Sequence, residues 1–344
     1  MKNLKSVELI PKAIGEVVIF RADMDVPTKN GEITDDKRLK NSVKDISMLI
    51  KKGYRIVIIG HRGRPIGYEE KFSLKPIAAR FLEIIKTELG NEEITNTFIE
   101  DITNETEVKH AINLHQVIFT ENIRFYQEEQ AGSIVHFSLL MKYSSVFIFD
   151  AITVAHRSDG SVVLQKEMEE IYYGSNFMRE YKAIEKLNQI DLIIIAGAKD
   201  DKTKYLSQLA NRSGTIFIGG KLPLSRTKIE SSQTPTNVVW ATLTEDSYDL
   251  SSQSIIDLKI LIQNSKTIVW TGALGWFEKG YNKGTVEIAT ALIESNSYIV
   301  IGGGDTGASI IGLGGKDRID FLCSGGGALL YALAFGPENL PAVS

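Results

Sequence analysis

The chain has little cysteine, no long apolar run and little net charge, and each shortage excludes a class of protein. Its one cysteine, Cys323, rules out an internal disulfide framework and suits a reducing cytoplasm. No apolar stretch approaches the ~20 residues of a membrane span, and the N-terminus lacks the apolar core of a signal peptide. The formal net charge of −4 gives no reason to expect nucleic acid. We therefore expect a cytoplasmic protein with neither a membrane nor a nucleic-acid partner.

What the chain contains is the composition of a folded globular protein. Hydrophobic residues make up 43% and charged residues 24% of its 344 residues, which is ordinary for such domains. The length is long for one core, so two domains are expected. Nine of the twelve arginines precede residue 180, whereas most paired glycines follow it. This asymmetry predicts that one half binds an anion with guanidinium groups and that the other binds its ligand with backbone amides.

Short β-branched runs alternate with amphipathic stretches along nearly the whole chain. The alternation predicts an α/β protein with two Rossmann-like three-layer lobes and mainly parallel sheets. A segment rich in Glu, Lys and Tyr separates the two sets, so we expect lobes over 1–170 and 189–327 joined by a linker helix over 171–188. Strands are expected at 17–21, 55–60, 97–100, 116–120, 146–150, 192–196, 215–219, 237–241, 267–271, 298–302 and 319–323.

Three strand-to-helix turns in the second half are built from paired or triple glycines. Glycine leaves no side chain between the backbone amides and a ligand, and the following helix directs its unpaired N–H groups into the same space. Such helix starts attract phosphate, although a tight turn alone also needs glycine. Three in one domain favour a polyphosphate site. The turns are Gly219-Gly220, Gly302-Gly303-Gly304 and Gly325-Gly326-Gly327.

Polar side chains follow the predicted strands of the first half. Arginine's planar fork matches carboxylate and phosphate oxygens, and arginines at several strand ends can form a multidentate clamp. Taken singly, each of these residues is more often solvated, paired or structural, so the prediction rests on their recurrence. In such sheets ligands bind beyond the carboxyl ends of the strands. The candidates for binding an anion are Asp23, Asp25, Arg38, His61, Arg64, Arg124, His156 and Arg157.

Further polar residues lie at strand ends of the second half. Lys199 and Lys202 open a helix, where a lysine can act as a point charge on transferring phosphate. Glu278 lies beyond Gly275 among aromatic residues and can accept hydrogen bonds from ribose hydroxyls. Asp305 begins a helix, where aspartate is usually just an N-cap. Beside a polyphosphate it can instead hold Mg²⁺.

Two other motifs are disfavoured. Gly302, Gly304 and Gly307 match the GxGxxG pattern of dinucleotide-binding proteins, but they lie too near the C-terminus to begin a Rossmann unit. Cys323 precedes a glycine-rich turn, yet no histidine follows His156 to activate it as a nucleophile. The Walker pattern and the protein-kinase signatures are absent. The sequence therefore disfavours a dehydrogenase.

In order along nearly the whole chain, these segments resemble the phosphoglycerate kinase family. RADMDVP resembles RVDFNVP, HRGRP resembles HLGRP, ENIRFYQEE resembles ENLRFHPEE, and DAITVAHRSDGS resembles DAFGTAHRAHAS. In the second half, GAKDDK, WTGALGWFE, IGGGDTGAS and CSGGGALL are similar to GAKVSDK, WNGPMGVFE, IGGGDTAAA and STGGGASL. Eight collinear matches are far more specific than any one of them.

The resemblance implies a monomeric, hinge-bending kinase that moves the acyl phosphate of 1,3-bisphosphoglycerate to MgADP, giving 3-phosphoglycerate and ATP. By position, the eight candidates of the first half would line the 3-phosphoglycerate site, and Asp305 would reach Mg²⁺. The segment 328–344 would pack back on the first lobe. The residues that would act on the transferred group are Arg38, Lys202 and Gly304. Those that would hold the nucleotide are Lys199, Lys202, Gly219, Gly220, Gly275, Glu278, Gly303, Gly304, Asp305 and Thr306.

The chain departs from the family pattern beside the expected ligands. Asp25 replaces an asparagine and Asp159 replaces a histidine, so both add negative charge to an anion site. Lys221 stands where a third glycine is usual, Thr271 replaces an asparagine, and the stretch 221–270 is shorter than usual. These changes leave two alternatives open: a same-fold binding or regulatory protein with little turnover, and a kinase for another small acyl phosphate.

Overall fold

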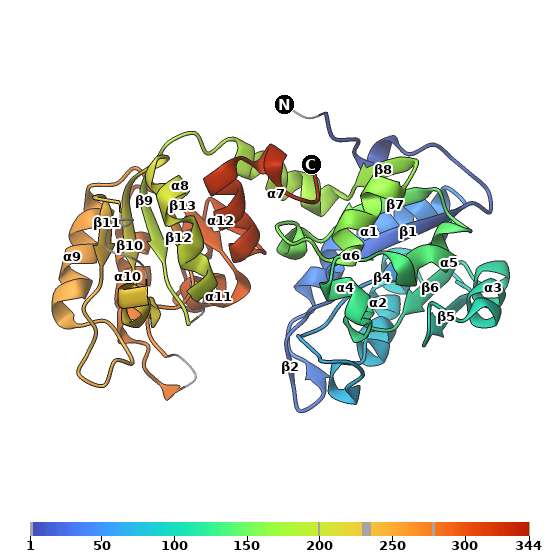
Figure 1. Cartoon of the computed structure of the whole chain (residues 1–344), viewed down its shortest axis with the longest axis horizontal. Coiled ribbons are helices and arrows are strands. Elements are labelled where there is room, and N and C mark those ends of the chain that lie inside the picture. Colours follow the sequence, from blue (N-terminus) through green and yellow to red (C-terminus); the bar gives the residue numbers. More distant parts are fainter. Residues whose placement is uncertain (1–2, 199, 229–234, 277–278, 344) are drawn as a thin grey trace. The chain divides into compact units, whose positions relative to one another are not determined.

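The computed structural model describes residues 3–198, 200–228, 235–276 and 279–343, with the side chains of 200, 201, 228 and 305 excepted. The chain forms two compact units (Figure 1). One comprises Met1–Tyr181 together with Pro341–Ser344, and the other comprises Lys182–Leu340. Within the described residues, no helix has the length and apolar character that crossing a bilayer requires.

The first unit is built on a six-stranded parallel sheet in the order β5-β6-β4-β1-β7-β8. Its strands are β1 (Val17–Ala22), β4 (Arg55–Ile59), β5 (Asn96–Ile99), β6 (Val117–Thr120), β7 (Val146–Asp150) and β8 (Glu170–Tyr173). A small antiparallel hairpin pairs β2 (Thr28–Lys29) with β3 (Glu32–Ile33). The helices are α1 (Lys37–Lys51), α2 (Lys75–Glu88), α3 (Glu105–Leu114), α4 (Gln127–Gln130), α5 (Ser138–Met141) and α6 (Gly160–Val163). The boundary between the units falls within a further helix, α7 (Ser175–Glu185).

Helices cover the central strands of this sheet, so these strands are mainly apolar. In β1, Val18 and Phe20 pack with apolar residues of α1 and α2, while Ile19 between them is equally buried. A parallel sheet covered on both faces requires this continuous apolar pattern. Most polar residues therefore lie near the ends of these strands or beyond them, and the candidate residues follow the carboxyl ends.

The second unit repeats the design with the strand order β11-β10-β9-β12-β13-β14, again all parallel. Its core gathers around the fully buried Trp270 of β12. The strands are β9 (Ile190–Ile195), β10 (Ser213–Ile218), β11 (Val238–Trp240), β12 (Thr267–Thr271), β13 (Tyr298–Gly302) and β14 (Phe321–Cys323). The helices are α8 (Leu206–Ala210), α9 (Ser252–Gln263), α10 (Lys283–Glu294), α11 (Gly304–Gly312) and α12 (Gly326–Phe335).

The predicted fold class is confirmed, and all eleven expected strands are present with small shifts at their ends. The segment boundaries differ from those expected. β8 occupies the start of the expected linker, because its Tyr172 and Tyr173 are buried against the first unit. α12 belongs to the second unit, so the C-terminal return to the first unit comprises only the residues from Pro341 onward.

That short return is held by specific bonds of the first unit. Ala342 donates its N–H to the carbonyl of Ala155 at 3.1 Å and accepts the Tyr173 hydroxyl at 3.0 Å. Gln165 donates its side-chain amide to the Pro341 carbonyl at 3.2 Å. Ala342 is fully buried, so these bonds are shielded from water.

Two buried carboxylates hold the start of α7. Asp150, at the end of β7, accepts the Phe177 N–H at 2.8 Å and the Ser42 hydroxyl at 2.6 Å. Asp45 of α1 accepts the Ser175 N–H at 2.6 Å. Burial, and then the neighbouring Asp45, raises the pKa of Asp150 to about 8. Asp150 is therefore a structural group, although it ends a strand at the polar edge.

We expect Asp150→Asn to abolish much of the pH dependence of stability between about pH 5 and pH 8. Because the folded pKa of about 8 exceeds the unfolded value of about 3.9, the contribution of protonated Asp150 to the free energy of unfolding is complete below the unfolded pKa. It falls by up to about 1.4 kcal/mol per pH unit toward the folded pKa and is lost above it. Urea unfolding at several pH values measures this, and an unchanged slope in the variant would contradict the assignment.

Candidate functional site

Four loops of the first unit bring polar side chains to one edge of its sheet. They follow β1, β4, β6 and β7, and β1 lies between β4 and β7 while β6 adjoins β4. Because all these strands are parallel, their carboxyl ends meet at the same edge. The sheet order therefore places the loops side by side.

Arg38, at the start of α1, is fixed by the loop that follows β1. Its Nη1 donates to Asp23 Oδ1 at 3.3 Å and to the Asp25 carbonyl at 2.9 Å. Asp23 in turn accepts the Thr153 hydroxyl on Oδ2 at 3.1 Å. About a quarter of the Arg38 side chain, 27%, stays exposed. The side chain is thus held in place by a carboxylate and remains partly exposed to solvent.

His61 follows β4 and is almost completely buried beside a buried arginine. Arg21, fully buried in β1, places Nη2 at 2.9 Å from His61 Nδ1. The other ring nitrogen, Nε2, lies 3.8 Å from Asp25 Oδ2. Burial lowers the pKa of His61 well below its ordinary value, and Arg21, Arg124, Arg157 and Arg38 lower it further. The ring is therefore neutral at physiological pH.

The Gly63 turn joins these groups to the loop after β6. Its N–H donates to Asp25 Oδ1 at 2.9 Å, and its carbonyl accepts Arg124 Nη1 at 2.8 Å. Its φ is +64°, and a Cβ here would lie 2.4 Å from the Phe72 ring. The backbone of this turn consequently requires glycine.

Arg124 is buried and bound to Asp159. Its Nη2 donates to Asp159 Oδ2 at 2.9 Å, and only 3% of the arginine is exposed. The expected extra negative charge at position 159 thus directly neutralises one cation of the cluster. The second added carboxylate, on Asp25, is held by the Gly63 N–H.

The structure brings five of the eight predicted first-unit residues into one set of contacts. These are Asp23, Asp25, Arg38, His61 and Arg124. Arg157 is near enough to lower the pKa of His61. His156 is half-buried in the same loop. Arg64 is exposed, and the described part of the chain shows no hydrogen bond or ion pair from its side chain to the cluster.

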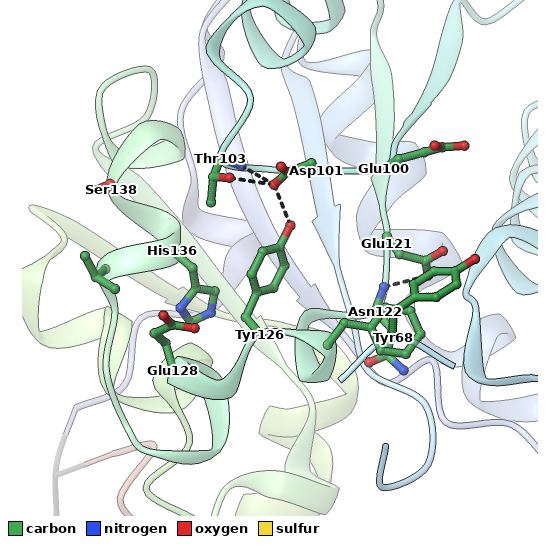
Figure 2. Close-up of a pocket in the computed structure, with 12 residues that line it drawn as sticks. Tyr68, Glu100, Asp101, Thr103, Glu121, Asn122, Tyr126, Glu128, His136 and Ser138 are labelled. Atoms are coloured by element: carbon green, nitrogen blue, oxygen red, sulfur yellow. Dashed lines mark hydrogen bonds between the residues drawn. The ribbon is translucent and has the colours of Figure 1, made fainter. Parts of the chain in front are cut away.

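A pocket of about 520 Å³ lies beside this cluster, at the ends of β5 and β6 (Figure 2). Its wall carries four carboxylates, and Tyr126 donates its hydroxyl to one of them, Asp101, at 3.0 Å. Carboxylates repel an anionic ligand, so this pocket is distinct in chemistry from the arginine cluster. The acidic residues are Glu100, Asp101, Glu121 and Glu128.

In the second unit, turns that contain glycine pack closely against one another at the carboxyl edge of the sheet. A Cβ on Gly220, after β10, would lie 2.5 Å from the Gly197 nitrogen after β9. A Cβ on Gly272, after β12, would lie 2.0 Å from the Ala196 carbonyl oxygen, and its φ is +93°. Neighbouring turns approach within backbone contact, and only glycine permits that approach.

The turn after β13 has open space beside its glycines. Gly303 has φ +99° and donates its N–H to the Cys323 carbonyl at 2.9 Å. A Cβ on Gly303 or Gly304 would meet nothing within 4 Å. The first N–H groups of α11 therefore border unfilled space, which suits an anionic ligand. Thr306 in the first turn accepts the Gly272 N–H at 2.9 Å and ties this turn to the next.

Lys202 supplies positive charge between two of these turns. Its Nζ donates to the Ala196 carbonyl at 2.7 Å and lies 2.7 Å from the position that a Cβ on Gly272 would occupy. Lys221, which follows Gly220, places its ammonium 3.4 Å from the centre of the Trp276 ring. Gly219 and Gly275 pack tightly, against Leu274 and the Tyr281 carbonyl.

Three predicted nucleotide residues lie outside the described part of the chain. They are Lys199, Glu278 and the side chain of Asp305. Among the described residues, no three His, Cys, Asp or Glu side chains are grouped closely enough to hold a metal ion. Cys323 is buried, with Sγ 3.5 Å from the Gly325 carbonyl, which fits the expectation that it is structural.

Comparison with known proteins gives the family. A model of the family described as Phosphoglycerate kinase matches residues 10–236 and 224–335. The chain belongs to the phosphoglycerate kinase family. A protein named phosphoglycerate kinase from Clostridium botulinum (strain Kyoto / Type A2) is 29% identical, with 99% of this chain and 98% of the relative aligned. One of that name from Finegoldia magna is 28% identical, with 96% of each aligned.

Solved structures share the fold. A phosphoglycerate kinase from Pyrococcus horikoshii OT3 matches with a TM-score of 0.76 and 21% identity, covering 99% of this chain and 98% of that one. A phosphoglycerate kinase from Coxiella burnetii matches with a TM-score of 0.69 and 23% identity over the same shares. The Clostridium alignment spans 398 positions against 344 residues here. The relative therefore carries residues that this shorter phosphoglycerate kinase family member lacks.

Sequence reasoning missed the buried supports of the cluster. Thr153 anchors Asp23, and Asn122 receives the Arg124 N–H at 3.1 Å. Arg21 was visible in the RADMDVP motif, yet nothing in the motif indicates that it faces His61. Glu129 was visible as the last glutamate of ENIRFYQEE, but its partners are distant in sequence. Only the fold reveals these pairs.

Proposed function

We propose that this chain is a phosphoglycerate kinase. It would transfer the acyl phosphate of 1,3-bisphosphoglycerate reversibly to MgADP, giving 3-phosphoglycerate and ATP, as a cytoplasmic monomer. The observation that carries the proposal is the arrangement of Arg38, held on Asp23 and the Asp25 carbonyl beside His61. It lies in a chain whose family match spans both units. Phosphoryl transfer needs mainly positioning and positive charge around the phosphoryl oxygens.

The first unit would hold the three-carbon acid. The Arg38 side chain is partly exposed, and its position is set by Asp23. Arg157, near His61, adds positive charge, and the His61 ring can contribute a neutral N–H donor. Arg64 and His156 would complete the site by position in the family pattern. This set matches the carboxylate and phosphate oxygens of 3-phosphoglycerate.

The second unit would hold MgADP on backbone amides and Lys202. The unfilled space at Gly303 and Gly304 would admit phosphate oxygens to the start of α11. Gly219, Gly220 and Gly275 would border the nucleoside with Lys199 and Glu278, and Thr306 would keep the α11 start in register with Gly272. Magnesium would arrive bound to the nucleotide, and Asp305 would reach it.

The proposal is tested by a coupled assay of 3-phosphoglycerate phosphorylation by MgATP. Turnover in the range of ordinary enzymes supports it, at about 1–10³ per second. Tight MgADP binding without turnover on this acid would instead favour the binding protein or the kinase for another acyl phosphate. In that case, turnover with acetyl phosphate or another small acyl phosphate would identify a kinase, and its absence would identify a binding protein.

A second candidate function is favoured by one observation, the ion pair between Asp159 and Arg124. Because it neutralises a cation of the anion site, it favours an acid that carries less negative charge. Assays with a series of small acids, from singly to triply charged, distinguish this kinase from the leading proposal. Preference for 3-phosphoglycerate would exclude it.

We expect Asp159→Asn to lower KM for 3-phosphoglycerate on the order of tenfold. The asparagine oxygen can still accept the Arg124 N–H, so the geometry is kept while the competing negative charge is removed. Steady-state kinetics at constant ionic strength measure the effect, with Glu287→Gln as the control because Glu287 pairs with Lys259 in the second unit. A raised KM would mean that Asp159 orients Arg124 for the substrate.

A further inference from the structure

A buried line of hydrogen bonds runs behind the anion-binding face of the first unit. It begins at Glu129 of α4, passes through Ser161 of α6 and Arg21 of β1, and ends on His61. All four residues are at most 3% exposed. The segments that carry them are separated widely in the sequence, so the fold alone assembles the line.

The arginine end of this line fixes the state of His61. A guanidinium offers only donors and stays charged, so it cannot accept a hydrogen bond. Arg21 Nη2 lies 2.9 Å from His61 Nδ1, and therefore Nδ1 must be the acceptor and carry no proton. The neutral imidazole then has its proton on Nε2, the nitrogen that lies 3.8 Å from Asp25 Oδ2.

The carboxylate end of the line balances the buried charge of Arg21. Arg21 is fully buried, and its described hydrogen-bond partners are neutral: Ser161 Oγ at 3.0 Å, the Ala22 carbonyl at 2.6 Å and His61. An uncompensated buried charge costs several kcal/mol. Glu129 supplies the compensation through Ser161, accepting its hydroxyl at 2.6 Å and its N–H at 2.7 Å.

The polarity of each link in the line is therefore determined. Ser161 has one hydroxyl proton, which it gives to Glu129, and a lone pair, which receives Arg21 Nε–H. Glu129 is packed tightly, since a Cβ on Gly160 would lie 3.0 Å from its Oε2. Its other neighbour is His136, with Nε2 at 3.4 Å, whose ring stacks on Tyr126 at the pocket wall (Figure 2).

We propose that Glu129, acting through Ser161 and Arg21, is a positioning residue that holds His61 as the neutral tautomer with its proton on Nε2. His61 then offers the substrate anion a fixed N–H donor, while Arg21 supplies the positive charge behind it. Charged groups around the ring come from β1, from α1 and from the loops at the carboxyl edge of the sheet. They are Arg21, Asp25, Arg38, Arg124 and Arg157. Only the expected change in the kinetics of 3-phosphoglycerate phosphorylation rests on the proposed function.

The tautomer is tested directly by nitrogen-15 NMR of the full chain labelled at histidine. The chain has five histidines, and the signal missing from His61→Gln identifies His61. We expect the Nε2–H pattern with no titration between about pH 5 and pH 8. A protonated ring or the Nδ1–H pattern in the unaltered chain would overturn the proposal. This result does not depend on any catalytic activity.

The role of the line is tested by Ser161→Ala and Glu129→Gln. Each should release Arg21, so that His61 shows mixed tautomers and begins to titrate. KM for 3-phosphoglycerate should rise about tenfold or more, with a smaller change in kcat, as for a lost hydrogen bond to a charged group. Ser144→Ala is the matched control, because it removes another buried hydroxyl, one bonded to the Val17 and Val146 carbonyls.

The outcomes separate this inference from the proposed function. An unchanged His61 spectrum in both variants would show that the line does not position the ring and would overturn the inference. If the unaltered chain does not phosphorylate 3-phosphoglycerate, the proposed function fails, while the NMR spectra still decide the tautomer. Should one variant not fold, the other variant and the spectrum of the unaltered chain decide it.

Discussion

Arg38→Ala should lower kcat for 3-phosphoglycerate phosphorylation on the order of 10³-fold or more while leaving the protein folded. Arginines that stabilise the charge of a transferring phosphoryl group contribute factors of about 10³–10⁵. Arg38 suits this role because Asp23 and the Asp25 carbonyl orient one side of its guanidinium at 3.3 and 2.9 Å. The arginine is thus held at the edge of the sheet where the phosphoryl group is expected to bind.

The split between kcat and KM distinguishes this role from simple binding. An interaction made only in the transition state lowers kcat and kcat/KM together, whereas uniform binding raises KM alone. Arg80→Ala is the control, since Arg80 forms exposed ion pairs with Asp36 and Glu83 outside the cluster. A normal kcat with only a raised KM in Arg38→Ala would remove Arg38 from the transfer step.

Gly272→Ala should destabilise the second unit by about 4 kcal/mol or more, which is at the extreme for one methyl group. The new Cβ would lie 2.0 Å from the Ala196 oxygen and 2.7 Å from Lys202 Nζ, in a backbone held at φ +93°. Relief would require β9 and β12 to separate at their hydrogen-bonded ends. The same shift would displace Lys202 and weaken nucleotide binding.

Tryptophan fluorescence during urea unfolding measures this loss for the second unit by itself. The chain has three tryptophans, Trp240, Trp270 and Trp276, and all belong to that unit. Gly280→Ala is the matched control because Gly280 has a similar φ of +83° and nothing within 4 Å of a Cβ. It should cost only the strain of a positive φ, about 1–2 kcal/mol. Equal losses in the two variants would contradict the clash at Gly272.

The sequence predicted the strands and their polar ends well, because both follow from local patterns. A continuous apolar run such as 17–20 is visible in the sequence before the fold is known, and the polar residues that follow it are expected near the sheet edge. β8 was missed because Glu170–Tyr173 is short and follows an irregular, charged stretch. Its burial depends on β7 and the C-terminal return, which no local pattern reveals.

The contacts that set the chemistry could not be predicted in the same way. Asp159 was recognised as an added negative charge, but its pairing with Arg124 depends on how two loops meet at the sheet edge. The link from Glu129 to Arg21 passes through Ser161 and joins residues more than a hundred positions apart. Such pairings are products of topology, and motif spacing carries no information about them.

The bonds of Ala342 to Ala155 and Tyr173 affect the order in which the protein can mature during translation. A ribosome releases the earlier part of the chain first, and domains commonly fold as they emerge. Here the second unit can be complete while the first still lacks its last segment. The unit made first is thus the one finished last, because the residues that complete it follow the whole of the second unit along the chain.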